Sequence, residues 1–507
     1  MAHDSKKHWA VLLQCTIPAV IIALILFLYS GKKSFFSDEM DQLGILTSVH
    51  SLSELLGLYS AVGHEVAPPL FATVAWFWMK IVPLSQRFLQ LLPVLLTACG
   101  VFFLGLAGKS TFGGKSGVSF LLPAVLSLFM PAVSLTAGMQ LRQYGLLFFF
   151  SSLLIWLFFL RYRISTAGKR FSIPVAILYG IAMAGLPYTH YVSVLLPIGL
   201  AAADLVQVLR KKLPFPYLFS YLFGALLFLP WAFIIFRSIS GRTEFWIDPP
   251  RLRDILQTMF FLTDGSAPGL IFSLLVWGLV LIAVQLATPA KNLSPSDRLF
   301  PVLYSAVPFF MIFAVFLYSK LNPDISLFLD RYFLVLIPLL AVIEAKGIFD
   351  LFRLLDSPAL SGKLSFLLSA LTVFLLLMGS VTLWNKVQKD TDTIYEPYLE
   401  AADLLSSQPD ICSDSTAVFT SNLSQYVTQG WKVLYWDPEV SSDVSIYDYS
   451  NSAEASPSFS VIYTFVEHAS LPSDLSGILA GHYRPDPSFP VSFRVSRYIN
   501  ITGGNAQ

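Results

Sequence analysis

Three carboxylates lie close together near the start of the chain. Asp38, Glu39 and Asp41 fall in the stretch SDEMD, shortly after an apolar run at 9–29. A carboxylate at the edge of a membrane-length apolar run is placed to act as a general base toward a substrate hydroxyl. The same Asp-Glu-x-Asp pattern offers oxygen ligands for a divalent cation, and a solvated loop is a third interpretation. The spacing therefore indicates a candidate site and leaves its chemistry open.

A second group of side chains combines cations with aromatic rings at the ends of later apolar runs. Arg142 and Arg331 each lie at the start of such a run, and a tyrosine follows each of them, Tyr144 and Tyr332. Guanidinium groups bind phosphate oxygens in bidentate geometry, so this group suits a lipid phosphate. Charges at span ends also anchor helices at the interface, and only a shared depth favours a site. Further candidates of the group are His64, His190 and Lys320.

The elements that carry these residues have the composition of membrane spans. The chain of 507 residues is 55% hydrophobic and only 13% charged, against about 25% charged residues in soluble domains. Its mean hydropathy is +0.66. The net charge of +1 gives no indication of a nucleic-acid partner, and Cys15, Cys99 and Cys412 form neither a disulfide framework nor a metal-spaced pair. We therefore expect a polytopic α-helical membrane protein.

The course of the chain through the bilayer depends on one ambiguous stretch, 68–84, which is short and opens with two prolines. If it lies along the membrane surface, the basic clusters of alternate loops fall on the same side as the amino terminus, as the positive-inside rule requires. We therefore predict a cytoplasmic amino terminus, interfacial helices in the outer segment 30–87, and about eleven spans. The spans are expected at 9–29, 88–107, 118–137, 143–160, 171–189, 191–208, 216–236, 269–287, 299–318, 331–349 and 365–384.

The composition changes after the last of these runs and becomes polar. We predict a transmembrane catalytic domain at 1–384 and a small extracytoplasmic α/β domain at 385–507. Short runs rich in β-branched and aromatic residues are typical of strands. Within the second domain they occur as STAVFT (415–420), KVLYW (432–436), FSVIYTFV (459–466) and VSFRVSRYINI (491–501).

Ionisable side chains are absent from the centres of all eleven predicted spans. A transporter or flippase needs polar groups near the midplane of the membrane, so this pattern argues against those functions. Asp204 and Glu344 fall at cytoplasmic span ends. The predicted topology instead places Asp38, Arg142 and Arg331 at the same depth on the outer face.

Six stretches in this order resemble the GT-C glycosyltransferases that use polyprenyl-phosphate sugars, a superfamily that includes protein mannosyltransferases and lipid A aminoarabinose transferases. The resemblance covers residues 10–385. It departs from the family pattern at Ala67, where a histidine normally abuts the two prolines, and at Gln140, where a glutamate is usual. The stretches are SDEMDQL (37–43), HEVAPPLF (64–71), QRFLQLLPVLL (86–96), MQLRQYGLL (139–147), PYTHYVSVLLP (187–197) and DRYFLVLIPLL (330–340).

The resemblance implies an inverting glycosyltransferase that acts at the outer face, in a bacterial inner membrane with a periplasmic carboxyl-terminal domain. Its partners would be a polyprenyl-phosphate-linked sugar donor, membrane lipid, and a lipid, glycan or protein acceptor. Asp38 with Glu39 would be catalytic, and no cofactor is indicated beyond the open divalent cation. The donor phosphate would be bound by Arg142, Arg331, Lys320, His64 and His190, supported by Tyr144 and Tyr332.

Two other functions stay open at this point. An envelope-glycan polymerase or ligase would use a diphosphate-linked donor, and the arginine-rich stretch RSISGRTEFWIDPPRLRD (237–254) would suit one. A non-enzymatic transporter or flippase is the other alternative, although the apolar span centres disfavour it.

Overall fold

Two compact units make up the chain. The first comprises Met1–Tyr29, Leu56–Val74 and Gln90–Asp390, and the second comprises Ser30–Leu55, Ala75–Leu89 and Thr391–Gln507. The predicted division at residue 384 stays a prediction. The computed structural model describes residues 2–61, 68–112, 118–168, 171–239, 247–286, 295–354, 361–391, 398–413, 416–421, 425–436, 444, 446–448, 459, 461–466, 479, 483–487, 489 and 495–500.

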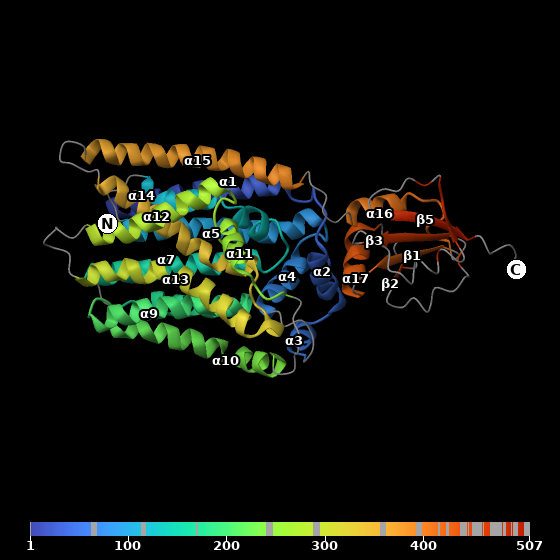
Figure 1. The fold of residues 1–507 in the computed structure, drawn as a ribbon, viewed down its shortest axis with the longest axis horizontal. Helices are drawn as coiled ribbons and strands as arrows, with labels where there is room; N and C mark the ends of the chain where they lie inside the picture. Colours follow the sequence, from blue (N-terminus) through green and yellow to red (C-terminus); the bar gives the residue numbers. More distant parts are fainter. Residues whose placement is uncertain are drawn as a thin grey trace. The chain divides into compact units, whose positions relative to one another are not determined.

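Long apolar helices dominate the first unit (Figure 1). Within the described ranges, eight are long and apolar enough to cross a membrane, so the chain is an integral membrane protein. They are α1 (Ala2–Tyr29), α5 (Gln86–Phe112), α7 (Tyr144–Thr166), η3 with α9 (Tyr191–Val194, Leu195–Leu209), η4 with α10 (Phe215–Leu218, Phe219–Ile239), α13 (Pro295–Leu321), η6 with α14 (Asp330–Leu336, Ile337–Leu354) and α15 (Ser361–Thr391).

Three of the predicted spans have a different form. The helices α8 (Ile173–Thr189) and α12 (Ala267–Leu286) are apolar, and α8 is shorter than a usual span. The run at 118–137 is not one helix, because Pro123 and Pro131 each remove a backbone donor from it. The number of crossings stays a prediction. The broken run consists of η1 (Ser119–Leu121), α6 (Leu122–Ser127) and η2 (Ala132–Ala137).

The segment 30–87, predicted to lie on the outer face, contains three short helices, α2 (Ser37–Ser48), α3 (Leu52–Ser60) and α4 (Pro69–Ile81). The 13 residues of α4 give a length of about 20 Å, against about 30 Å for the hydrocarbon core of a bilayer. This length is too small for a crossing, in keeping with the predicted interfacial helices. Two more short elements, α11 (Leu252–Phe261) and η5 (Pro323–Ile325), lie in later segments.

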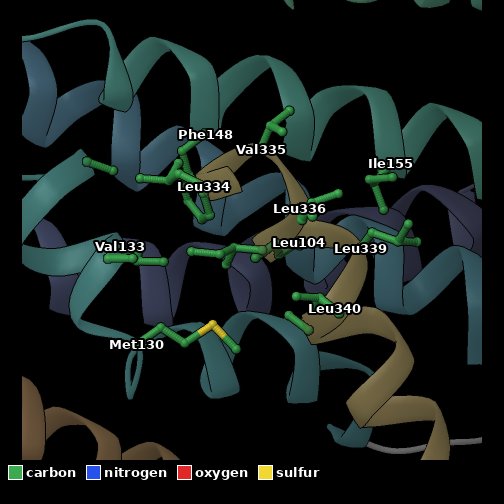
Figure 2. Close-up of a cluster of buried hydrophobic side chains, with 14 of the residues drawn as sticks. Leu104, Met130, Val133, Phe148, Ile155, Leu334, Val335, Leu336, Leu339 and Leu340 are labelled. Carbon is green, nitrogen blue, oxygen red and sulfur yellow. The ribbon is translucent and has the colours of Figure 1, made fainter. Parts of the chain in front are cut away.

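The core of the first unit surrounds the segment that begins with Asp330 and Arg331. Leu334, Val335 and Leu336 of η6 are fully buried. They form one cluster with Phe148 and Ile155 of α7, Leu104 of α5, Val133 of η2, and Met130, which lies just before η2 (Figure 2). The guanidinium-bearing start of η6 is therefore attached directly to the most buried part of the unit.

The second unit contains the predicted α/β fold. Its five-stranded sheet has the order β2-β1-β3-β5-β4, in which β1 pairs in parallel with β2 and β3, and β5 pairs antiparallel with β3 and β4. The strands predicted at 415–420, 459–466 and 491–501 correspond to β1, β3 and β5. The elements are α16 (Tyr398–Ser406), β1 (Thr416–Ser421), α17 (Gln425–Tyr435), β2 (Ile446–Asp448), β3 (Val461–Val466), β4 (Tyr483–Pro485) and β5 (Val495–Asn500).

The strand predicted at 432–436 is wrong, because most of that stretch belongs to helix α17. Val427 and Trp431 are four residues apart and both are buried, whereas Val433 is exposed. This is the spacing of one helix face and not the alternation of a strand. The buried face of α17 packs on α2 (Figure 1), so the segment at 30–55 and the carboxyl-terminal segment share one unit.

Candidate active site

The acidic pair lies in the first turn of α2, in the second unit. Glu39 is only 3% exposed, and its Oε2 accepts a hydrogen bond from the backbone N–H of Phe36 at 3.0 Å. This bond satisfies a donor that helix geometry leaves unpaired, so Glu39 caps α2. Asp38 is more exposed than Glu39. Of the two, Asp38 is the carboxylate that is more available to a substrate.

Two arginines and a histidine of the first unit lie on or next to elements that pack together. Arg142 precedes α7, His190 lies between α8 and η3, and Arg331 is the second residue of η6. The elements α7 and η3 both pack against η6. The charges of both arginines act on His190, so the three groups belong to one cluster, which we call the outer cationic cluster.

Two tyrosines complete the outer cationic cluster. The ring of Tyr332 lies 4.2 Å from the imidazole ring of His190, measured between centroids. The guanidinium carbon of Arg331 lies 6.0 Å from the ring centroid of Tyr144, and Tyr144 itself is fully buried. Aromatic faces attract cations, so Tyr144 helps to orient Arg331, whereas Tyr332 packs on the imidazole ring of His190.

His190 is neutral at physiological pH. It lies between two helices, outside the membrane-spanning segments, and is 7% exposed. Burial, followed by the charges of Arg331 and Arg142, lowers its pKa to about 3. Its Nδ1 atom has no hydrogen-bond partner among the residues that the structure describes. A buried imidazole that feels the charges of two guanidinium groups lies in an environment that favours an anion.

The other predicted phosphate ligands are placed differently. Lys320 lies in the last turn of α13 with its side chain exposed. His64 lies outside the described residues. Asp330, next to Arg331, accepts the backbone N–H of that arginine through Oδ1 at 2.6 Å, and so fixes the start of η6. The roles of these residues stay predictions, and the cluster itself consists of Arg142, His190 and Arg331 with the two tyrosines.

A metal site receives no support from the geometry. In the part of the chain that the structure describes, no three His, Cys, Asp or Glu side chains are grouped to hold an ion. The divalent cation that the Asp-Glu-x-Asp pattern suggested therefore stays a sequence-based alternative.

Sequence reasoning missed a set of contacts that reach the acidic segment from the carboxyl-terminal part of the chain. The hydroxyl of Tyr435 accepts the backbone N–H of Phe35 at 2.9 Å and donates to Oε1 of Gln86 at 2.9 Å. Tyr435 fell inside the stretch that was interpreted as a strand, and no local pattern links it to residues 400 positions away.

Comparison with known proteins gives similarity in structure only. No protein-family model matches the sequence, and no curated protein matches it either. The crystal structure of ArnT from Cupriavidus metallidurans bound to undecaprenyl phosphate matches with a TM-score of 0.56 and 11% identity, over 99% of each chain. The apo structure of the same protein matches with a TM-score of 0.59 and 11% identity, over 98% of each chain. The likeness shows that the chain has the GT-C-like fold that the sequence predicted.

Proposed function

We propose that this chain is an inverting glycosyltransferase that takes a sugar from a polyprenyl-phosphate donor at the outer face of a membrane. The observation that carries the proposal is the outer cationic cluster, where the charges of Arg142 and Arg331 both act on a buried His190. A further support is the shared fold with a protein that has been crystallised with undecaprenyl phosphate. A monophosphate with an apolar tail matches both the charge of the cluster and the apolar helices that carry it.

The proposed reaction needs little more than electrostatic stabilisation from the cluster. The bond between the anomeric carbon and the phosphate oxygen breaks, and the electron pair leaves with the polyprenyl phosphate. Arg142 and Arg331 stabilise the charge that develops on this leaving group. Because the leaving group is already a phosphate, no general acid is required.

Asp38 is proposed as the base. As the acceptor hydroxyl attacks the anomeric carbon from the face opposite to the phosphate, its proton moves to the Asp38 carboxylate. The new glycosidic bond then has inverted configuration, as in inverting glycosidases. Glu39, which caps α2, would act by holding the first turn that carries Asp38.

The test is transfer by the purified protein with a panel of polyprenyl-phosphate sugars, measured as release of free polyprenyl phosphate. We expect release with at least one monophosphate donor, and Asp38→Asn should lower it by about 10³-fold or more, since a general base contributes up to 10⁴-fold. Asp41→Asn, three residues after Asp38 in α2, is the matched control and should keep most of the activity.

Two outcomes would contradict the proposal. Turnover of Asp38→Asn at the wild-type rate would remove this residue as the base. Use of diphosphate-linked donors alone would favour an envelope-glycan polymerase or ligase over the proposed enzyme.

A further inference from the structure

Residues 33–35, shortly before α2, are held by Gln86 and by groups from the carboxyl-terminal segment. The hydroxyl of Tyr435, on α17, accepts the N–H of Phe35 and donates to the side-chain amide oxygen of Gln86. The amide nitrogen of Gln86 in turn donates to the carbonyl of Lys33. One hydroxyl therefore closes a ring of hydrogen bonds that joins three separate stretches of the second unit. Phe35 is fully buried and Gln86 is 7% exposed, so water does not readily replace these bonds.

A second connection lies at the neighbouring residue. Oγ of Ser34 donates to Oε2 of Glu400 at 3.0 Å. The Ser34 Oγ also accepts the backbone N–H of Leu399 at 2.9 Å. Both partners belong to α16. Residues 33–35 have no regular secondary structure, so their backbone groups depend on such partners.

The body of α2 is held from the same direction. Gly430 of α17 lies against the backbone of Met40, and a Cβ atom at position 430 would overlap the Met40 carbonyl oxygen. Only glycine permits this close approach of the two helices. The start and the middle of α2 are thus both fixed by the carboxyl-terminal segment (Figure 1).

The state of the Tyr435 hydroxyl suits a permanent bridge. Burial raises its pKa, and the charges of Glu39 and Glu400 act in the same direction. The hydroxyl therefore keeps its proton and can donate to Gln86 while it accepts from Phe35. Glu39 is also the neighbour of Asp38 in the sequence, so the bridge lies close to the acidic turn.

We propose that Tyr435 is a positioning residue for catalysis: its hydroxyl holds residues 33–35, and through them the turn of α2 that carries Asp38. This inference rests on the proposed function, in which Asp38 is the base. The carboxyl-terminal segment then works as part of the catalytic machinery and not only as an attached domain. Misplacement of a reacting group by about 1 Å costs about 100-fold in rate, so a single bridge can have a measurable effect.

The experiment compares Tyr435→Phe with Tyr463→Phe. The Tyr463→Phe variant also removes a hydroxyl that donates a hydrogen bond. In the wild type this bond goes to Oδ1 of Asp410 at 2.7 Å, within the same α/β fold. We expect kcat of Tyr435→Phe to fall about 10-fold with an unchanged KM for the donor, because binding of the phosphate belongs to the outer cationic cluster. Tyr463→Phe should keep the wild-type kcat.

Two further readouts separate positioning from general stability. Ser34→Ala removes the neighbouring connection and should lower kcat in the same way. In an Asp38→Glu background, where the carboxylate is already displaced, Tyr435→Phe should cost much less than in the wild type. Equal losses in Tyr435→Phe and Tyr463→Phe, or fully additive losses with Asp38→Glu, would overturn the inference.

Amide hydrogen exchange tests the bridge without any activity. In Tyr435→Phe the Phe35 amide loses its acceptor, so exchange over residues 33–41 should become at least several-fold faster, and Tyr463→Phe should leave it unchanged. If the wild-type protein transfers no sugar, the proposed function fails, and the exchange result still decides whether Tyr435 holds this segment. Unchanged exchange in Tyr435→Phe would overturn the inference even in an active enzyme.

Discussion

Two arginines near opposite ends of α7 lie in different electrostatic surroundings. Arg142 precedes the helix and belongs to the outer cationic cluster, whereas Arg161 lies near the end of the helix beside Asp204. The separation of 19 positions from Arg142 to Arg161 corresponds to about 28 Å along a helix, close to the thickness of a bilayer core. The Arg161 guanidinium contacts aromatic rings and pairs with a buried carboxylate, whereas the charge of Arg142 acts together with that of Arg331 on His190.

The Arg161 region is a closed network of opposite charges and hydroxyls. Nη2 of Arg161 lies 2.6 Å from Oδ2 of Asp204, and the Tyr221 hydroxyl donates to the same oxygen at 2.8 Å. The guanidinium carbon lies 3.4 Å from the ring centroid of Tyr179, whose hydroxyl is 2.8 Å from that of Tyr221. These residues come from α7, α8, α9 and α10. Arg161, Tyr179 and Asp204 are buried and Tyr221 is partly buried, so the network joins four helices.

The comparison shows how charge arrangement separates a structural role from a binding role. Opposite charges that neutralise each other inside a protein fix the elements that carry them. Like charges that gather around one imidazole leave a positive potential, which an anion would relieve. The outer cationic cluster is of the second kind, because the charges of Arg142 and Arg331 both lower the pKa of His190.

The largest expected effect is on donor use. Replacing Arg142 and Arg331 together by glutamine should lower kcat/KM for the donor by about 10³-fold, because each charge-assisted hydrogen bond contributes about 1.5–3 kcal/mol. The free energy of unfolding should change little, since the substitutions also relieve repulsion. The measurement is the release of polyprenyl phosphate at varied donor concentration. Arg163→Gln, at an exposed position near the end of α7, is the control. An equal loss of kcat/KM in this variant would mean that the arginines of the outer cationic cluster have no special role in donor use.

The Arg161 region should respond in stability and not in donor use. Arg161→Met leaves Asp204 buried without its partner and should lower the free energy of unfolding by about 3–5 kcal/mol. The double variant Arg161→Met/Asp204→Leu should recover most of this loss. Thermal unfolding in detergent measures both variants. A double variant as unstable as the single one, or a changed KM for the donor, would contradict a purely structural role.

The pH dependence of stability tests whether His190 is held neutral in the folded chain. Its pKa is about 3 in the folded chain, against about 6.5 in an unfolded one. Between these values the unfolded state binds the proton and the folded state does not, so stability falls as the pH decreases from about 6.5 toward 3. From pH 7 to pH 4.5 this contribution should be about 2.5 kcal/mol.

His190→Gln provides the comparison for this pH effect. The variant should lose less stability than the wild type between pH 7 and pH 4.5, as followed by melting temperature. His50→Gln, at an exposed position, should behave like the wild type. Identical pH profiles for His190→Gln and the wild type would mean that His190 is not held neutral by its surroundings.

The smallest expected effect is on KM for the donor when Lys320 is replaced, and it tests how far the outer cationic cluster extends. Lys320 was predicted to bind the donor phosphate, but its side chain is exposed, and exposed charge pairs contribute only about 0.2–1 kcal/mol. Lys320→Ala should therefore raise KM for the donor by less than about 5-fold. A loss comparable with that of Arg331→Gln would extend the cluster to α13.

Much of the fold followed from local patterns in the sequence. Apolar runs of membrane length predicted most of the long helices. The shared depth of Asp38, Arg142 and Arg331 was expected because a bilayer restricts charged groups to two layers, and it stays a prediction. The break at 118–137 was missed, although Pro123 and Pro131 lie in that run.

Other features had no local signature. The helix at 425–435 was interpreted in part as a strand, since a short window of Val, Leu, Tyr and Trp fits both patterns. The contact of Tyr435 with Phe35 joins residues 400 positions apart, and the pairing of Arg161 with Asp204 joins two helices. Such pairs depend on tertiary packing, which a single sequence does not display.

The most direct test of the central claim is the structure of the protein in lipid nanodiscs with undecaprenyl phosphate added, determined by electron cryomicroscopy. The account predicts phosphate density within hydrogen-bonding distance of the guanidinium groups of Arg142 and Arg331, and its loss in the double glutamine variant. Phosphate density that lies away from both arginines, or that persists in the variant, would contradict the proposal that the outer cationic cluster binds the donor.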